Sequence, residues 1–135
     1  MIFEAKLSNL HKMLKHIDKI ANNVGFSDKD LHKIQLASEE ALVNVISYAY
    51  PPNSQGRVDV KCEFRIKRYL TIIIKDNGLI FNPLDHCKVD VNAPLEKRKI
   101  GGLGIFFFLK AMDELEYHRE GDFNFLKMTK RVSNK

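Results

Sequence analysis

An alternating stretch in the middle of the chain, RVDVKCEFRI at residues 57–66, constrains the fold more than any other feature. Charged side chains alternate there with apolar ones, which are Val58, Val60, Cys62, Phe64 and Ile66. A period of two residues predicts a strand with one face on the core and the other in solvent. The apolar run YLTIIIK follows after Lys67 and Arg68 alone, and so short a connection predicts a hairpin.

Two amphipathic helices are predicted before this hairpin. The first has apolar residues at three- and four-residue spacing, namely Leu10, Met13, Leu14, Ile17, Ala21 and Val24. We expect Ser8 to cap its start and Gly25 to end it. Ser27 and Asp30 resemble a capping box, which opens a second helix over about residues 28–48.

Further strands are predicted at both ends of the chain. Residues 1–7 form a short candidate strand, and the segments 115–120 and 123–130 form a closing hairpin across a Gly-Asp pair. Residues 82–100 have no steady period and contain two prolines, so they are expected to form a long loop of the kind that often serves as a lid. A third helix is predicted over residues 105–114.

The order of these elements predicts an α+β fold. Strands and helices occur in runs, without βαβ alternation, so we expect a two-layer sandwich with helices on one face of a mixed or antiparallel sheet. A chain of 135 residues is expected to form one domain, residues 1–135, and to bury a real core.

Composition narrows the classes of protein to consider. The chain is 44% hydrophobic and 29% charged, which is typical of a soluble globular protein, and no run is long and apolar enough to span a membrane. It has two cysteines in no metal-type spacing and no secretory segment, so we expect a cytoplasmic protein. The net charge of +5 lacks the aromatic-basic pattern of nucleic-acid binding, and indicates a solvated face or a phosphate-bearing ligand.

One candidate site lies within the second predicted helix. Glu40 and Asn44 are four residues apart, so their side chains lie one above the other on a face that should otherwise be buried. The amide oxygen of Asn44 suits Mg²⁺, and the carboxylate of Glu40 could take a proton from an attacking hydroxyl. On its own, such a pair is more typical of a solvated helix edge than of a site.

Two further candidate sites are loops that contain glycine. Asp76 ends the second strand of the hairpin, where it can accept a hydrogen bond from an amine, and Gly78 lets a flat ring approach the backbone. Residues 101–104, GGLG, precede the third helix, and bare N–H groups at a helix start suit phosphates. The basic residues 97–99 just before them strengthen the phosphate interpretation. Taken singly, each loop is also typical of a plain turn or hinge.

Together, the three motifs resemble those of a known family, the GHKL (histidine-kinase-like, Bergerat-type) ATPases, and within it the anti-sigma factor serine kinases. EEALVNVISYAY is similar to the N-box of that family, and DNGLIFNP and GGLGIFFFLKAMDE are similar to its two glycine boxes. The resemblance extends over nearly the whole chain. The chain departs from many relatives at Ile80, where they have a second glycine.

The resemblance implies roles for individual residues. Asn44 would ligate Mg²⁺ beside ATP, and Glu40 would be the general base for a serine hydroxyl, although Glu39 beside it is a weaker alternative. Asp76 would bind the adenine amino group, with Gly78 packed beside the ring. The expected phosphate-binding residues are Lys99, Gly101, Gly102, Leu103 and Gly104, with residues 82–100 as the ATP lid.

The resemblance also implies a function: an ATP-dependent protein serine kinase that sequesters a sigma factor and phosphorylates a STAS-domain antagonist. A homodimer that does not bind nucleic acid or membrane directly is expected with it. An alternative is a catalytically inactive ATP-binding module that controls a partner by binding alone. A more distant alternative is nucleic-acid binding through the basic surface, which would weaken steeply with salt and would not depend on Asn44.

Overall fold

A computed structural model describes residues 1–48, 56–80 and 111–133 of the chain. The expected loop at residues 82–100, the glycine run at 101–104 and most of the third predicted helix lie outside these ranges.

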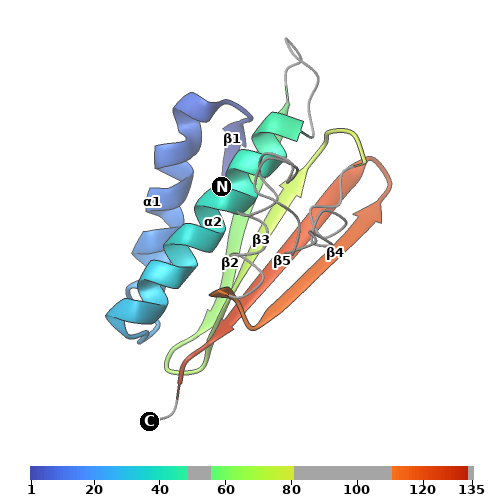
Figure 1. Ribbon diagram of the computed structural model, residues 1–135. Helices are drawn as coiled ribbons and strands as arrows, with labels where there is room; N and C mark the ends of the chain where they lie inside the picture. The colour runs from blue at the N-terminus through green and yellow to red at the C-terminus, as the bar shows by residue number, and fades with distance from the viewer. Residues whose placement is uncertain (49–55, 81–110, 134–135) are drawn as a thin grey trace, which may run out of the picture.

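The described elements follow the predicted order. They are β1 (Ile2–Glu4), η1 (Leu7–Asn9), α1 (Leu10–Ala21), α2 (Asp28–Tyr48), β2 (Arg57–Arg65), β3 (Tyr69–Asp76), β4 (Glu114–Glu120) and β5 (Phe123–Arg131). The strands form one five-stranded sheet in the order β1-β2-β3-β5-β4, and each neighbouring pair is antiparallel. Figure 1 shows α1 and α2 side by side over one face of the sheet. The α+β prediction is therefore confirmed.

The strand register places polar and charged side chains at both ends of the sheet. Asp76, the last residue of β3, lies opposite Val58 on β2 and Asn124 on β5. At the other end of β3, Tyr69 lies opposite Arg65 and Arg131. The carboxyl end of β3 and the hairpin between β2 and β3 thus define opposite ends of the molecule (Figure 1).

The core lies between the two helices and the sheet. Its fully buried large side chains are Met13, Ile17, Val24, Ile34, Leu42, Val58, Val60, Leu70, Ile72, Ile74 and Met128. Removing side chains of this size from water is the main stabilising term of a small domain, at about 1.5–3 kcal/mol each.

The two helices begin differently from one another. In α2, the backbone N–H of Asp30 donates to the Ser27 hydroxyl at 3.2 Å, as the predicted cap requires. In α1, the prediction that Ser8 caps the helix is wrong. Ser8 lies in the short helix η1, α1 begins at Leu10, and the Asn9 side chain donates to the Glu4 carbonyl instead of capping.

The helices cover only the first half of β2. Val58 and Val60 are fully buried, but Phe64 and Ile66 are 47% and 60% exposed although their pattern predicted a core face. The connection between the helices meets the hairpin here, where the Lys67 N–H donates to the Val24 carbonyl at 2.6 Å. Periodicity gives the face a side chain points to, but how far the opposite layer extends depends on tertiary structure.

Candidate functional site

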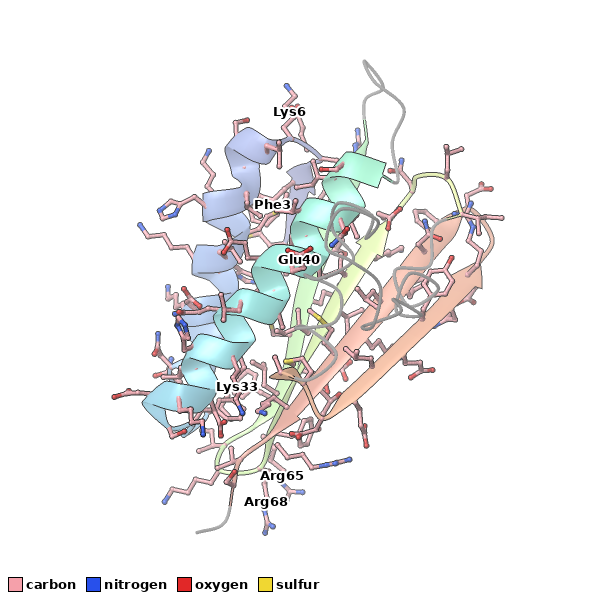
Figure 2. All side chains as sticks on the ribbon, in the orientation of Figure 1. Phe3, Lys6, Lys33, Glu40, Arg65 and Arg68 are labelled. Carbon is pink, nitrogen blue, oxygen red and sulfur yellow. The ribbon has the colours of Figure 1, made fainter. Side chains whose placement is uncertain are left out.

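The pair in α2 is held in a defined geometry. Asn44 is 2% exposed and Glu40, near the middle of the helix, is half-buried (Figure 2). The Asn44 side-chain N–H₂ donates to the Glu40 carbonyl at 2.7 Å and to its carboxylate Oε1 at 3.0 Å. Because both neighbours are acceptors, the amide nitrogen must face them, which leaves the Asn44 oxygen directed elsewhere.

This geometry fits a magnesium ligand. The structure gives the Asn44 oxygen no hydrogen bond among the described residues, so it can act as a neutral oxygen ligand. Within the described ranges, His, Cys, Asp and Glu side chains form no group of three that could hold a metal. Mg²⁺ commonly takes one or two protein ligands and completes its shell with water and substrate phosphates, so Asn44 suffices as a protein contribution.

Glu39 and Glu40 differ in their surroundings. The Glu39 side chain is exposed, whereas Glu40 is half-buried and bonded to Asn44 through Oε1. The second carboxylate oxygen of Glu40 accepts no hydrogen bond from the described residues and can receive a proton. The surroundings of Glu40 therefore fit the predicted general base better than those of Glu39 do.

Asp76 lies at the carboxyl end of β3, as the sequence predicted, and it is 3% exposed. Its Oδ1 accepts two hydrogen bonds at 2.9 Å, from the backbone N–H of Gly78 and from the side-chain amide of Asn124. Its other oxygen, Oδ2, accepts none within the described residues. One oxygen is thus fixed by the protein, and the other remains to accept a hydrogen bond from a ligand amine.

Asn124 on β5 organises this end of the sheet, and it is a residue that the sequence analysis missed. It is 2% exposed, and its amide donates both to Asp76 and to the Leu79 carbonyl, the latter at 2.8 Å. Its oxygen accepts a 2.5 Å hydrogen bond from the Tyr117 hydroxyl. The tyrosine thereby determines which way the amide faces, because its hydroxyl donates to the oxygen and leaves the nitrogen toward Asp76.

A pattern in β5 could have identified this residue. Leu126 and Met128 point into the core. Asn124, two residues before them, and Lys130, two residues after them, point to the same face because side chains alternate along a strand. A polar residue at an inward position of an apolar strand requires buried partners. The sequence alone does not give those partners, since Asp76 is 48 residues away along the chain.

The backbone after Asp76 is held by a second contact across the sheet. The Arg119 guanidinium on β4 donates to the Gly78 carbonyl at 2.8 Å and to the Gly121 carbonyl at 3.1 Å. Gly78 is thus bound through its N–H to Asp76 and through its carbonyl to Arg119. The segment that was expected to pack beside an adenine ring is fixed before any ligand arrives.

Burial governs the ionisation of Asp76. Desolvation raises the pKa of its carboxyl above the ordinary value of 3.8, because burial disfavours the charged form. The hydrogen bonds from Asn124 and Gly78 and the charge of Arg119 oppose that rise in pKa. A strand-end carboxylate with a perturbed pKa is a common mark of a functional site.

The predicted phosphate-binding residues lie outside the described part of the chain. These are Lys99, Gly101, Gly102, Leu103 and Gly104. The two other motifs are described in part, over residues 39–48 at the carboxyl half of α2 and residues 76–80 at and after the carboxyl end of β3. None of the helices in the described ranges is long and apolar enough to cross a bilayer.

Comparison with known proteins agrees with this arrangement. The family model described as a histidine kinase-like ATPase domain matches residues 3–130. The chain is 32% identical to the serine-protein kinase RsbW of Listeria monocytogenes over 123 residues, covering 86% of this chain and 75% of that protein. It is 29% identical to RsbW of Oceanobacillus iheyensis over 107 residues, covering 75% of this chain and 66%, or just under two thirds, of that protein.

Solved structures support the fold. The histidine kinase domain of the Erythrobacter litoralis EL346 blue-light activated kinase is similar with a TM-score of 0.57 at 16% identity, covering 93% of this chain and 60% of that one. The mycobacterial sensor histidine kinase MprB is similar with a TM-score of 0.52 at 14% identity, covering 97% of both chains.

Proposed function

Because this chain belongs to the histidine kinase-like ATPase domain family, we propose that it is an ATP-dependent protein serine kinase. Its similarity to RsbW serine-protein kinases, at about 30% identity, supports this assignment. By the same resemblance, it sequesters a sigma factor in the cytoplasm and phosphorylates a STAS-domain antagonist. The observation that carries the proposal is the Glu40 carboxylate, which is held beside the amide of Asn44.

The proposed chemistry assigns each oxygen of this pair a task. The free oxygen of Asn44 would hold Mg²⁺, which would supply positive charge to neutralise the ATP phosphates. Glu40 receives the proton of the substrate serine hydroxyl through its unbonded oxygen as the serine oxygen attacks the γ-phosphorus and ADP leaves. The Asn44 amide keeps the carboxylate in place through the 3.0 Å bond to its other oxygen.

The adenine base is assigned to the carboxyl end of β3. Oδ2 of Asp76 accepts a hydrogen bond from the exocyclic amine, and Gly78 lies beside the ring. Asn124, oriented by Tyr117, holds the other oxygen of Asp76. Lys99 and the residues Gly101, Gly102, Leu103 and Gly104 remain the proposed phosphate contacts.

A homodimer is part of the same proposal. Met1, Ile2 and Leu7 are 62%, 67% and 58% exposed, and the first two lie on or beside the edge strand β1. Exposed apolar side chains beside an open strand edge are suited to pairing with a second chain. Light scattering should give twice the monomer mass for the wild type. The charged variant Ile2→Lys should give the mass of a single chain.

The first test is calorimetric titration with ATP and ADP, with and without Mg²⁺. The wild-type chain should bind both nucleotides, and the dependence of affinity on Mg²⁺ should disappear in Asn44→Ala. Circular dichroism should show an unchanged fold, since all hydrogen bonds of this side chain to the described residues lie within its own helix. Absence of nucleotide binding to the wild type under all four conditions would remove the kinase proposal.

The second test separates a kinase from a module that only binds. With a serine-bearing STAS protein and labelled ATP, Glu40→Gln should bind ATP normally but transfer phosphate roughly a hundredfold more slowly. Glu39→Gln is the matched control, because it makes the same change on an exposed neighbour, and it should transfer at the wild-type rate. Equal rates in the two variants would show that Glu40 is not the base.

A further inference from the structure

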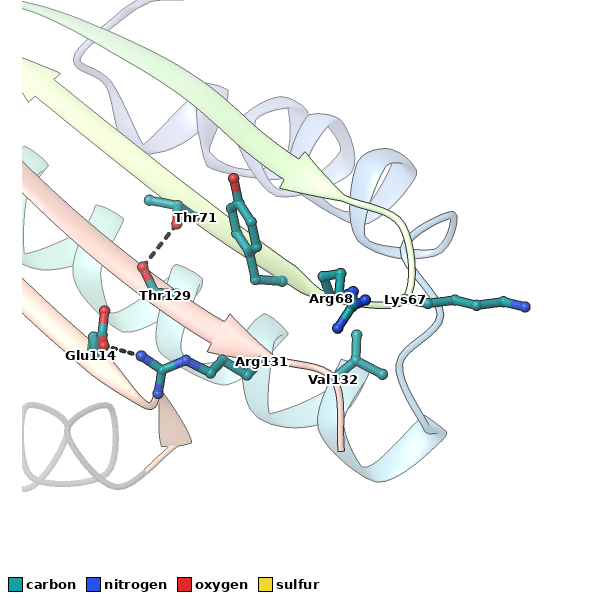
Figure 3. Close-up of a pocket in the computed structure, with 8 residues that line it drawn as sticks. Lys67, Arg68, Thr71, Glu114, Thr129, Arg131 and Val132 are labelled. Atoms are coloured by element: carbon teal, nitrogen blue, oxygen red, sulfur yellow. Dashed lines mark hydrogen bonds and ion pairs between the residues drawn. The ribbon is translucent and has the colours of Figure 1, made fainter. Parts of the chain in front are cut away.

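A hollow lies at the hairpin end of the sheet, opposite to Asp76 and on the face away from the helices. It measures about 480 Å³ and is lined by Lys67, Arg68, Tyr69, Thr71, Glu114, Thr129, Arg131 and Val132. Figure 3 shows Arg68, Arg131 and Glu114 around the two threonines, with Lys67 at the outer edge. The hollow is built from the β2–β3 turn, the start of β4 and the end of β5.

The charge of this hollow is positive and partly unneutralised. Arg131 is paired with Glu114, the one acidic side chain in the lining. Lys67 and Arg68 have no acidic partner among the described residues. On the neighbouring strand β2, Glu63 and Arg65 add one charge of each sign, so the excess of two positive charges remains.

The turn that carries the two cations is fixed by backbone hydrogen bonds. The N–H of Lys67 donates to the Val24 carbonyl at 2.6 Å, and Lys67 has a positive φ of 62°. The N–H of Arg68 donates to Arg65, and its carbonyl accepts from the Val132 N–H at 2.8 Å. The backbone of both residues is thus held in place, which lowers the entropy lost when a ligand binds their side chains.

The floor of the hollow offers hydrogen-bond donors. The hydroxyls of Thr71 and Thr129 lie 2.8 Å apart and share one hydrogen bond (Figure 3). That bond uses one hydroxyl hydrogen, so the other remains to donate. The phenol of Tyr69 and the side chains of Lys67 and Arg68 add donors around it. This set recognises oxygen acceptors that carry negative charge.

We propose that this hollow docks an acidic segment of a partner protein, with one carboxylate side chain seated on the threonine floor beside Arg68 and a further acidic side chain reaching Lys67 at the outer edge. Tyr69, which lines the hollow, is 38% exposed, and its ring suits a peptide that carries apolar residues next to its acidic ones. Complementary charge between such surfaces accelerates encounter and selects partners.

The geometry favours a protein segment over other anionic partners. The floor is recessed, and a protruding carboxylate side chain reaches it, whereas a flat bilayer surface does not. The two unneutralised cations, Lys67 and Arg68, match a few carboxylates of a peptide, whereas the continuous run of phosphates in a nucleic acid calls for a longer basic surface.

This docking site is independent of the proposed nucleotide chemistry. Tyr69 and Asp76 lie at opposite ends of β3, and seven residues of strand span about 23 Å. A partner can therefore occupy the hollow while the nucleotide end remains open. Binding of the acidic segment should require neither ATP nor Asn44.

The test uses the full chain and a fluorescein-labelled peptide of about 12 residues, rich in Asp and Glu with leucines between them. In anisotropy titrations at about 50 mM NaCl the wild type should bind, and binding should weaken at about 300 mM as screening shortens the reach of the charges. The double variant Lys67→Glu/Arg68→Glu should weaken binding about fivefold or more. Lys67→Gln/Arg68→Gln should give a smaller loss of affinity. This variant replaces the double glutamate variant in the test if the latter does not fold.

The matched control is Lys12→Glu/Lys15→Glu, on the exposed side of α1, which changes the net charge by the same amount. It should leave peptide affinity within about twofold of the wild type. An equal loss of peptide affinity in both double variants would mean that overall charge explains the binding, and it would overturn the proposed site. Absence of peptide binding at low salt, or binding to anionic phosphatidylglycerol vesicles in its place, would also overturn it.

Discussion

The two ends of the sheet differ in the burial and hydrogen bonding of their polar side chains. At the carboxyl end of β3, Asp76 and Asn124 are buried, and they are joined to Tyr117 and to the backbone by hydrogen bonds of 2.5–2.9 Å. At the hairpin end, Lys67 and Arg68 are exposed and have no acidic partner in the described residues. Buried, fixed polar groups suit a small ligand with defined donors, whereas exposed charges suit a larger partner whose contacts weaken with salt.

Strand β5 contributes a buried polar side chain to each end. Lys130 donates to the Ala111 carbonyl at 2.8 Å, with Asp30 and Asp113 at 3.9 and 4.0 Å, so its contacts are all within the protein. Asn124 instead holds a carboxylate whose second oxygen is left for a ligand. Equivalent positions in the pattern of one strand thus serve structure at one end and the proposed nucleotide site at the other.

Removing the amide at the buried end should have the largest effect on stability. Asn124→Ala leaves the Tyr117 hydroxyl without its acceptor and the Asp76 carboxylate with one donor fewer. We expect a loss of about 3 kcal/mol in the free energy of unfolding, measured by urea denaturation.

The matched control for that variant lies on the same strand at the other end. Thr129→Val removes one hydroxyl of the partly buried Thr71–Thr129 hydrogen bond and should cost about 1 kcal/mol or less. Tyr117→Phe, which removes one hydroxyl and keeps the ring, should fall between the two. Equal losses in Asn124→Ala and Thr129→Val would contradict the contrast between the ends.

Changing the carboxylate to an amide should change the preferred base. In Asp76→Asn the new oxygen should face the two donors, Gly78 and Asn124, which turns the new amine toward the ligand. ATP affinity should fall roughly a hundredfold because two donors then meet. Inosine triphosphate, which has a carbonyl in place of the amine, should gain affinity in the same titration. If ATP and inosine triphosphate weaken equally, Asp76 does not contact the base.

Acidification should weaken ATP binding through Asp76. Burial raises the pKa of the free protein's carboxyl above 3.8, and a hydrogen bond to an amine favours the ionised form. Affinity should be constant above that raised pKa and should fall up to about tenfold per pH unit below it. A titration series from about pH 7 to about pH 4 tests this, with inosine triphosphate binding by Asp76→Asn as a control that should stay flat across Asp76's titration range.

The smallest effect on stability should come from the hairpin end. Lys67→Gln/Arg68→Gln removes two exposed charges that have no acidic partner in the described part of the chain, so the free energy of unfolding should change by less than about 0.5 kcal/mol. Nucleotide affinity should also be unchanged in calorimetry. A loss comparable to that of Asn124→Ala would mean that these cations stabilise the fold and are not free to dock a partner.

The sequence by itself determined the order of elements, the hairpin and the bounds of α2, because periodicity and turn residues act within a few residues of one another. It also placed Glu40 beside Asn44, since four residues along a helix fix that proximity, and it placed Asp76 at a strand end. These features depend on local geometry that any helix or strand imposes.

Only the tertiary structure decided the partners of Asp76 and the character of the hairpin end. Asn124 and Tyr117 reach Asp76 through strand pairing across 48 and 41 residues of chain, which no local pattern encodes. The exposure of Phe64 and Ile66 likewise follows from where the helices stop covering β2. Both depend on how separate layers and strands meet, and that arrangement is set by packing of the whole core rather than by any one segment.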